Sequence, residues 1–143
     1  MRVERIDRSH LSAVAELERE CFFEPWSERS LKLLLTEDAI GFVCMDQERV
    51  VAYGGMLWAP DEGQITNVAV TADFRRMGCG RRIVEALICA ARERRCEMLS
   101  LEVRASNEAA ITLYERYGFS VAGRRRLFYK SPVEDALVMI LTL

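Results

Sequence analysis

Apolar residues recur along this chain with two different spacings, and the spacings predict its helices and strands. In residues 10–20 and 80–94 the apolar side chains return every three or four positions, which places them on one face of a helix. Shorter stretches that are apolar, or that alternate between apolar and polar, indicate strands. These strands are expected at residues 2–7, 40–45, 50–57, 62–70, 98–103, 120–128 and 136–143.

Polar residues and glycine at the ends of these segments predict where the helices begin and end. Ser9 is expected to cap the first helix, and Ser27 to cap a short second one. Asn107 is expected to cap a helix over residues 108–117, which Gly118 would end. These residue types mark helix starts because their side-chain oxygens accept hydrogen bonds from the free N–H groups of a first helical turn.

The elements follow one another in the order β-α-α-β-β-β-α-β-α-β-β, with residues 46–49 forming a hairpin turn. Helices and strands interleaved in this way predict a mixed α/β fold with helices on both faces of one sheet. The 143 residues have the length of one domain with one core, and no repeat or linker divides them. We therefore expect a single domain over residues 1–143.

Composition narrows the classes of protein and of site. The net charge of −2 does not favour general nucleic-acid binding, and the run Arg124-Arg125-Arg126 is expected to be a solvated face. Five cysteines without a CxxC pair, together with a single histidine, argue against structural zinc and fit the reducing cytosol. The sequence also lacks an apolar signal core and an apolar run of membrane-spanning length. These features predict a cytoplasmic protein without a metal ion and without direct contacts to nucleic acid or membrane.

The sequence Arg75-Arg76-Met77-Gly78-Cys79-Gly80 lies between a predicted strand and a predicted helix. Glycines at a bend that opens into a helix allow unusual dihedral angles and present backbone N–H groups to an anion, while the arginines add positive charge. The segment lacks the Lys-Ser or Lys-Thr pair of triphosphate-binding loops and the three glycines of the dinucleotide fingerprint. It predicts either a site for a nucleotide-like pyrophosphate or an ordinary glycine turn, with Cys79 as a spacer rather than a nucleophile.

Two residues further along the chain carry candidate acid–base chemistry. Glu102 alternates with Leu101 and Val103 on a predicted central strand, where lost solvation would raise its pKa and suit a general base. The alternative is an ordinary strand glutamate on a wet face. Tyr114 shares a helical stripe with apolar residues, which favours a core position, although its hydroxyl could instead face a ligand as a weak acid. A nucleophilic triad has little support, because the only histidine, His10, lies near the N-terminus.

Together these segments resemble the GNAT superfamily of acetyl-CoA-dependent N-acetyltransferases. The resemblance covers residues 40–143 and rests on the order and spacing of several motifs. These motifs are Asn67-Val68-Ala69-Val70, Arg75-x-x-Gly78-x-Gly80, Leu101-Glu102-Val103, Asn107 and Leu113-Tyr114-x-x-Tyr117-Gly118-Phe119. Within the superfamily the chain is most similar to the RimI group, the ribosomal-protein alanine N-acetyltransferases. The closer similarity rests on Pro25-Trp26-Ser27, Leu101-Glu102-Val103-Arg104-Ala105-Ser106-Asn107 and Glu134-Asp135-Ala136.

The resemblance implies a fold and a set of functional residues. The fold would be a GNAT-like α/β domain whose central sheet is mixed and mostly antiparallel. Glu102 would act as the general base and Tyr114 as the general acid, without a metal. Trp26 and Tyr129 would contact the acceptor substrate. The pantetheine arm and the pyrophosphate of acetyl-CoA would be bound by Val68, Ala69, Val70, Arg75, Arg76, Met77, Gly78, Cys79, Gly80, Arg81 and Asn107.

The resemblance also implies direct transfer of an acetyl group from acetyl-CoA to a protein N-terminus, specifically an alanine of a small-subunit ribosomal protein. Glu24 stands where relatives commonly carry an apolar or aromatic residue, so this position bears on acceptor specificity. One alternative is an acetyltransferase for a small amine or a lysine side chain, and another is a non-catalytic acyl-CoA-binding module. The presence of both Glu102 and Tyr114 argues against the module, since a pure binder needs neither.

Overall fold

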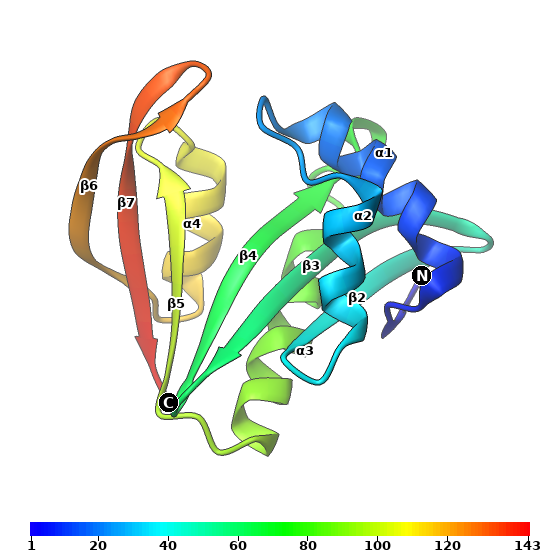
Figure 1. Ribbon diagram of the computed structural model, residues 1–143, viewed down its shortest axis with the longest axis horizontal. Coiled ribbons are helices and arrows are strands. Elements are labelled where there is room, and N and C mark those ends of the chain that lie inside the picture. Colours follow the sequence, from blue (N-terminus) through cyan, green and yellow to red (C-terminus); the bar gives the residue numbers. More distant parts are fainter.

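The computed structural model describes residues 1–143 and contains one seven-stranded sheet (Figure 1). The strands lie in the order β1-β2-β3-β4-β5-β7-β6, and all neighbours are antiparallel except β4 and β5. The strands are β1 (Arg2–Arg5), β2 (Ala39–Asp46), β3 (Arg49–Ala59), β4 (Glu62–Val70), β5 (Met98–Arg104), β6 (Ser120–Lys130) and β7 (Val133–Thr142). This arrangement confirms the predicted mixed, mostly antiparallel sheet.

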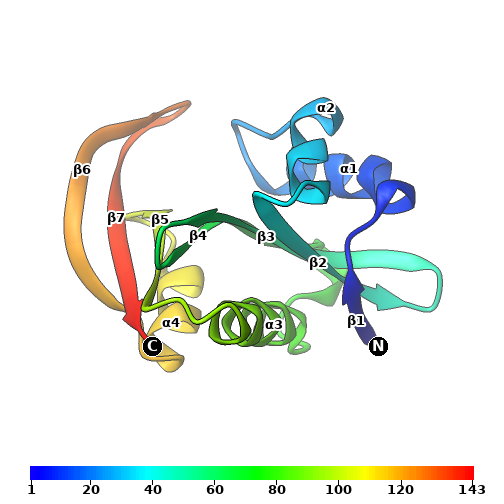
Figure 2. The ribbon, with the colours of Figure 1, turned by 60° about the horizontal axis from the view of Figure 1, so that its bottom comes forward.

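Four α-helices cover the two faces of the sheet (Figure 2). Helices α1 and α2 lie on one face, and α3 and α4 lie on the other. The helices are α1 (Leu11–Cys21), α2 (Glu28–Leu31), α3 (Cys79–Glu93) and α4 (Glu108–Arg116), with the 3-10 turns η1 (Arg8–His10), η2 (Lys32–Leu35) and η3 (Ala72–Phe74). Apart from the 3-10 turns, the order of helices and strands is the predicted one.

The helix starts agree with the sequence prediction at two places and differ at a third. Ser27 caps α2, because its hydroxyl oxygen accepts the backbone N–H three residues later at 3.1 Å. Asn107 caps α4 in the same way at 3.2 Å. The expected Ser9 cap is wrong. Asp7 accepts the N–H of Ser9 at 2.8 Å and caps the turn η1, so that α1 begins only after this turn.

The outer strands differ by a few residues from the bounds that the sequence predicts. β1 ends at Arg5, two residues before the expected end. β7 begins at Val133, three residues before the expected start, because Lys130 still pairs with Val133 across the β6–β7 hairpin. Ser131 and Pro132 alone occupy this turn, so both strands extend closer to it than their apolar pattern indicates.

Strands β4 and β5 meet at one end and diverge towards the other (Figure 1). Their parallel pairing joins only residues 62–64 to residues 98–100. On its other side β4 stays paired with β3 as far as Val70. Beyond Gln64, therefore, the backbone groups of β4 that face β5 have no strand partner. An open strand edge of this kind can hydrogen-bond an extended ligand.

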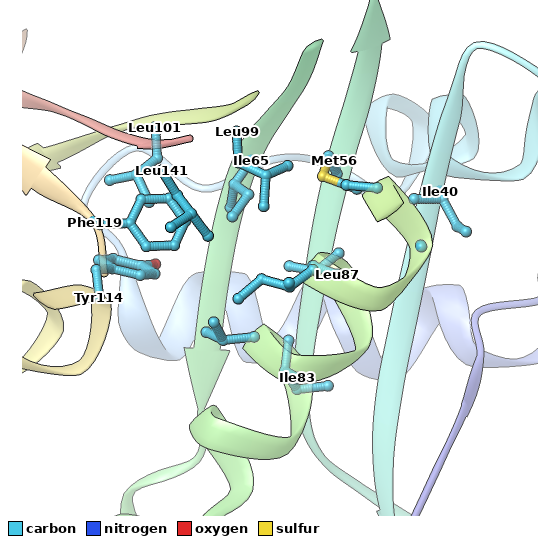
Figure 3. Packing of buried hydrophobic residues seen from close by; sticks show 14 of the residues in the cluster. Ile40, Met56, Ile65, Ile83, Leu87, Leu99, Leu101, Tyr114, Phe119 and Leu141 are labelled. Carbon is cyan, nitrogen blue, oxygen red and sulfur yellow. The ribbon is translucent and has the colours of Figure 1, made fainter. Parts of the chain in front are cut away.

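Two hydrophobic clusters, one on each face, hold the helices on the sheet. The larger has 21 buried residues and packs α3 and α4 against the strands. Figure 3 shows Leu87 of α3 close to Met56 and Ile65 of the sheet, with Tyr114 and Phe119 farther along the same layer. The smaller cluster has 12 residues and lies under α1 and α2. Each large aliphatic side chain buried in these layers contributes about 1.5–3 kcal/mol. Strand β4 is packed on both faces, whereas β5 contributes buried residues to the larger cluster alone.

Residues that often serve as nucleophiles or metal ligands take structural positions here. All five cysteines are free, and three of them are buried. His10 is buried, and its Nδ1 accepts the backbone N–H of Asp7 at 3.0 Å. The structure contains no group of three or more His, Cys, Asp or Glu side chains placed to hold a metal ion. Every helix is too short or too polar to cross a membrane.

Candidate active site

A cavity of about 860 Å³ opens where β4 and β5 diverge. The α1–α2 loop (residues 22–27) borders it on one side and the β6–β7 hairpin on the other. Its lining includes six of the predicted site residues, namely Trp26, Val68, Glu102, Asn107, Tyr114 and Tyr129. The fold therefore brings the predicted base, the predicted acid and both predicted acceptor contacts to one space.

Val68, Ala69 and Val70 form the last part of β4, beside the opening between the two strands. They pair with β3 on one side, while the backbone groups that point away from β3 have no strand partner. We call Val68–Val70 the free edge. The amide groups of a pantetheine arm are complementary to such an edge, because both alternate N–H donors and C=O acceptors.

The N-terminus of α3 has no side-chain cap. Gly78 is the N-cap residue, and its φ of 84° lies in the left-handed region, which glycine adopts without strain. The first turn contains no acidic residue, so no carboxylate competes for its N–H groups. The 15 residues of α3 concentrate partial positive charge at this end. These features suit an anionic group such as a pyrophosphate.

The three arginines around this helix start lie in different environments. Arg75 turns back towards β4, where its Nε donates to the Val70 carbonyl at 3.2 Å and its Nη2 lies 3.8 Å from Cys21 Sγ. Arg76 is exposed, with a positive φ of 63°, and Arg81 lies in the first turn of α3. Arg76 and Arg81 are therefore free to meet an anion, whereas Arg75 fixes the path of the loop.

Gly80 and Cys79 serve the packing of α3 more than the shape of the loop. A Cβ at Gly80 would lie 3.2 Å from Leu113 Cδ2, so glycine lets α3 approach α4 closely. The expectation that Gly80 supplies unusual dihedral angles is wrong, because its backbone is helical. Cys79 is 1% exposed, which leaves only its backbone N–H for a ligand. Met77 is exposed at the loop surface.

Glu102 lies on β5 with its side chain at the cavity. The side chain is 34% exposed, and its Oε1 lies 3.7 Å from Nε of Arg125 on β6. The expected loss of solvation is therefore only partial. Strand alternation does place Glu102 opposite the buried Leu101 and Val103, but its own face borders an open cavity. A carboxylate in this position can take a proton from an amine directly or through one water molecule.

The sequence left open whether Tyr114 on α4 is a core residue or faces a ligand, and the structure places it in both settings. The residue is 5% exposed, and its ring packs against Phe119 with 5.5 Å between the ring centroids. It also lines the cavity. Burial raises the pKa of Tyr114 well above its ordinary value, and the nearby Tyr129 is a smaller cause. The phenol is therefore protonated at neutral pH, so it can donate its proton or a hydrogen bond.

Three other predicted residues are held in place by their neighbours. Asn107 uses its Oδ1 to cap α4, so its amide NH₂ group remains for a ligand. The Tyr129 ring stacks on the guanidinium of Arg104, 4.2 Å from the ring centroid. Trp26 is half-buried, and its backbone N–H donates to Glu18 Oε1 at 2.8 Å. These contacts fix Trp26 and Tyr129 at the two borders of the cavity.

Glu18, which the sequence pattern did not single out, is a fully buried carboxylate beneath the α1–α2 loop. It accepts hydrogen bonds from the Tyr53 hydroxyl, from Asn67 Nδ2 at 2.9 Å and from the Trp26 backbone. Burial raises the pKa of Glu18, and these hydrogen bonds oppose the rise. Glu18 thereby ties the α1–α2 loop to β4. The sequence feature that could have identified Glu18 as buried is its spacing, because it lies four residues after Val14 on the apolar face of α1.

Known proteins are similar to this chain in sequence and in fold. Residues 11–119 match the model of the acetyltransferase (GNAT) family. The ribosomal protein bS18-alanine N-acetyltransferase of Escherichia coli K12 is 35% identical over 141 residues, which cover 97% of this chain and 95% of the relative. A Bacillus subtilis 168 relative, named as a putative ribosomal protein bS18-alanine N-acetyltransferase, is 33% identical and covers 100% and 93%.

Solved structures share the fold over nearly the whole chain. The crystal structure of the ribosomal-protein-S18-alanine N-acetyltransferase from E. coli has a TM-score of 0.90 and 34% identity, covering 99% of this chain and 92% of that chain. The crystal structure of the NatC complex bound to Gag peptide and CoA has a TM-score of 0.85 and 23% identity, covering 99% and 98%. At that identity the second likeness concerns the fold alone.

Proposed function

Since the chain belongs to the acetyltransferase (GNAT) family, and is an acetyl-CoA-dependent N-acetyltransferase, we propose that its acceptor is the α-amine of a protein N-terminus, specifically an alanine of a small-subunit ribosomal protein. The relatives in E. coli and B. subtilis support this choice of acceptor, because their names state an alanine of ribosomal protein bS18. With such an acceptor, the reaction would take place in the cytoplasm.

On the donor side, the free edge would pair with the amides of the pantetheine arm. The N-terminus of α3, with Gly78, Arg76 and Arg81, would hold the pyrophosphate. The amide group of Asn107 would contact the arm near its reacting end. Val68 and Asn107 line the cavity, so an arm bound between them would carry the thioester into the space between β4 and β5.

The proposed base suits an α-amine better than a lysine. An α-amine has a pKa near 8 and a lysine amine near 10.4, so removing the ammonium proton costs roughly 3 kcal/mol less for the α-amine. Glu102 would take this proton, directly or through water. The partial exposure of its carboxylate supports the assignment, because an amine that enters the cavity can reach it.

The transfer itself would need no covalent enzyme intermediate. The neutral amine nitrogen forms a bond to the thioester carbonyl carbon, and the carbon–sulfur bond then breaks. The ammonium proton would go to Glu102, and the departing thiolate would receive a proton from Tyr114. The second proton, which the nitrogen loses as the amide forms, would return to the Tyr114 oxygen. The observation that carries this proposal is that both side chains line one cavity, at the place where the edge of β4 is free.

An acetylation assay with matched acceptors tests the proposal. A peptide that begins with alanine should be acetylated well, since its small first residue fits between Trp26 and Tyr129. The same peptide with a blocked N-terminus and one internal lysine should react poorly, as should a panel of small amines. If the blocked lysine peptide or a small amine proves the better acceptor, the N-terminal assignment is wrong and the broader amine acetyltransferase takes its place.

A further inference from the structure

A buried carboxylate on α1 is hydrogen-bonded to β4 next to the free edge. Helix α1 packs against β3 and β4 (Figure 1), and its Glu18 is the only acidic residue that the fold buries. One carboxylate oxygen accepts from the Tyr53 hydroxyl and, at 2.9 Å, from Asn67 Nδ2, while the other accepts from the Trp26 backbone at 2.8 Å. A buried charge is costly unless it is hydrogen-bonded, so the carboxylate holds these three partners in fixed positions.

Asn67 lies in an irregular part of β4, immediately before the free edge. The register between β3 and β4 shifts there, so that Thr66 and Asn67 together lie opposite Gly55 alone. Two residues of one strand facing one residue of its neighbour form a β-bulge, which bends the strand and increases its twist. The bulge follows Gln64, the last residue of β4 that pairs with β5. It therefore influences the direction in which the free edge leaves β5.

The two residues of the bulge differ in their side-chain contacts. The Thr66 hydroxyl is buried without a hydrogen-bond partner and faces Gly55, where an added Cβ would lie 2.8 Å from it. Asn67 is half-buried and donates to Glu18. The extra residue of a bulge is left unpaired in the strand ladder, so its position depends on contacts outside the ladder. The hydrogen bond between Asn67 and Glu18 is such a contact, and it joins the bulge to α1.

We propose that Glu18 is a positioning residue for the acetyl donor, which fixes the bulge of β4 through Asn67 and thereby orients the free edge towards the pantetheine arm. Glu18 is 0% exposed, so it acts through its partners and not by touching a ligand. The inference rests on one part of the proposed function, the placement of the pantetheine arm along the free edge. It does not depend on which amine is the acceptor.

A fixed edge binds an extended ligand more tightly than a mobile one. The amides of the arm can pair with β4 only where the N–H and C=O groups of the free edge already point towards them. Without the contact from Glu18, the bulge is free to change its twist, and the edge must be ordered when the arm binds. That ordering reduces affinity. The chemical step is unaffected once the donor is bound, because neither Glu102 nor Tyr114 contacts Glu18.

Coenzyme A is the probe for the test, because it carries the pantetheine arm and needs no acceptor. Glu18→Met, Asn67→Ala and the double variant form a double-mutant cycle that is measured by calorimetry. Glu18→Gln can keep a hydrogen bond to the Asn67 amide, which offers both a donor and an acceptor. Tyr53→Phe is the matched control for lost stability, since it removes another hydrogen bond of the same carboxylate and leaves the contact with Asn67 in place.

Glu18→Met and Asn67→Ala should each weaken coenzyme A binding about tenfold, and the double variant should weaken it no further, because both changes remove the same contact. The KM for acetyl-CoA should rise in parallel, while kcat at saturating acetyl-CoA should stay within about twofold of the wild type. Glu18→Gln should lose about threefold or less in affinity. Tyr53→Phe should bind coenzyme A like the wild type, although its melting temperature should be lower.

Two results would overturn the inference. Additive losses in the double variant would mean that Asn67 acts on the cofactor without Glu18. An equal loss in Tyr53→Phe and Asn67→Ala would trace the effect to general loosening of the fold. If Glu18→Met does not fold, the comparison of these two variants decides, and weaker binding in Asn67→Ala alone supports the role of Glu18.

NMR of the wild-type protein separates this inference from the proposed function on which it rests. Coenzyme A should shift the amide signals of Val68 and Val70. If these signals do not move, the proposed place of the pantetheine arm is wrong. If they move and Asn67→Ala binds coenzyme A as tightly as the wild type, the placement of the arm stands and the role of Glu18 is wrong.

Discussion

At the scale of single residues, the cavity combines side chains with opposite degrees of solvation. Glu102 is partly exposed and lies beside Arg125, so it can exchange protons with an entering amine. Tyr114 is buried and stays protonated, so it can serve as a proton donor. In the proposed reaction, this arrangement would supply a proton acceptor for the ammonium and a proton donor for the departing thiolate within one space.

Replacing Glu102 by Gln should remove the base while keeping the shape of the side chain. The rate at pH 7 should fall about 10²-fold or more, and the deficit should shrink above about pH 8–9, where the α-amine deprotonates unaided. A pH series of kcat/KM with the alanine peptide measures this. A variant that matches the wild type at neutral pH would assign the base to another group or to bulk water.

Replacing Tyr114 by Phe keeps the ring that packs against Phe119 and removes only the hydroxyl. Turnover should slow on the order of 10²-fold, with nearly unchanged thermal stability. Steady-state kinetics and a melting curve on the same preparation check both parts. Full turnover in the variant would leave Tyr114 as a core aromatic residue without a catalytic role.

At the scale of elements, the sequence pattern predicts features that neighbouring residues determine, such as helix caps. It does not predict contacts between segments that lie far apart in the chain. Ser27 and Asn107 cap their helices as expected, because a cap is decided within three residues. The Ser9 prediction fails for a related reason, since Asp7 is a competing acceptor two residues away. The hydrogen bonds that Glu24 accepts from the backbone N–H groups of Lys130 and Ser131 could not be foreseen, because these partners lie more than 100 residues along the chain.

The start of α3 offers a test in which backbone shape can be separated from packing. A Cβ at Gly78 would meet nothing within 4 Å, so Gly78→Ala adds no clash and only strains the positive φ. It should cost about 1–2 kcal/mol of stability and weaken coenzyme A binding, because the N–H groups at the helix start would turn.

Calorimetry with coenzyme A measures the affinity of this variant. Gly123→Ala is the control, since its added Cβ would also meet nothing within 4 Å and its φ is not positive. Gly80→Val is a poorer probe, because Leu113 lies too close for the added side chain. If Gly78→Ala binds coenzyme A as tightly as the control, the cofactor's pyrophosphate is held elsewhere.

At the scale of the whole molecule, hydrogen-bonded surface carboxylates link distant segments. Asp73 pairs with Arg49, Glu134 accepts from Ser106, and Asp135 accepts from the backbone N–H of Leu127. Each of these partners holds the pKa of its carboxylate below the ordinary value, as Lys130 does for Glu24. Protons therefore bind these groups more readily in the unfolded chain than in the folded one.

Acid should consequently destabilise the fold. The depressed pKa values mean that these groups contribute their stability above the ordinary values of 3.8 and 4.5, and lose it as the pH falls through the lower folded values. The melting temperature should be nearly constant from about pH 7 to pH 5 and should fall steeply below about pH 4. Asp135→Asn should flatten part of this fall. A melting temperature that holds to pH 3 would contradict the prediction.

The outer strand β6 affects how readily two molecules of this protein can pair through the edges of their sheets. It forms one edge of the sheet, its residues are almost all exposed, and its ladder is interrupted by two register shifts. A regular exposed edge invites the sheet of a second molecule to continue it. The two register shifts interrupt the ladder of this strand, and Arg126 adds a charge to it, whereas Arg124 and Arg125 lie beside the carboxylates of Asp135 and Glu102. The strand that borders the cavity is therefore a poor template for pairing with a strand of a second molecule.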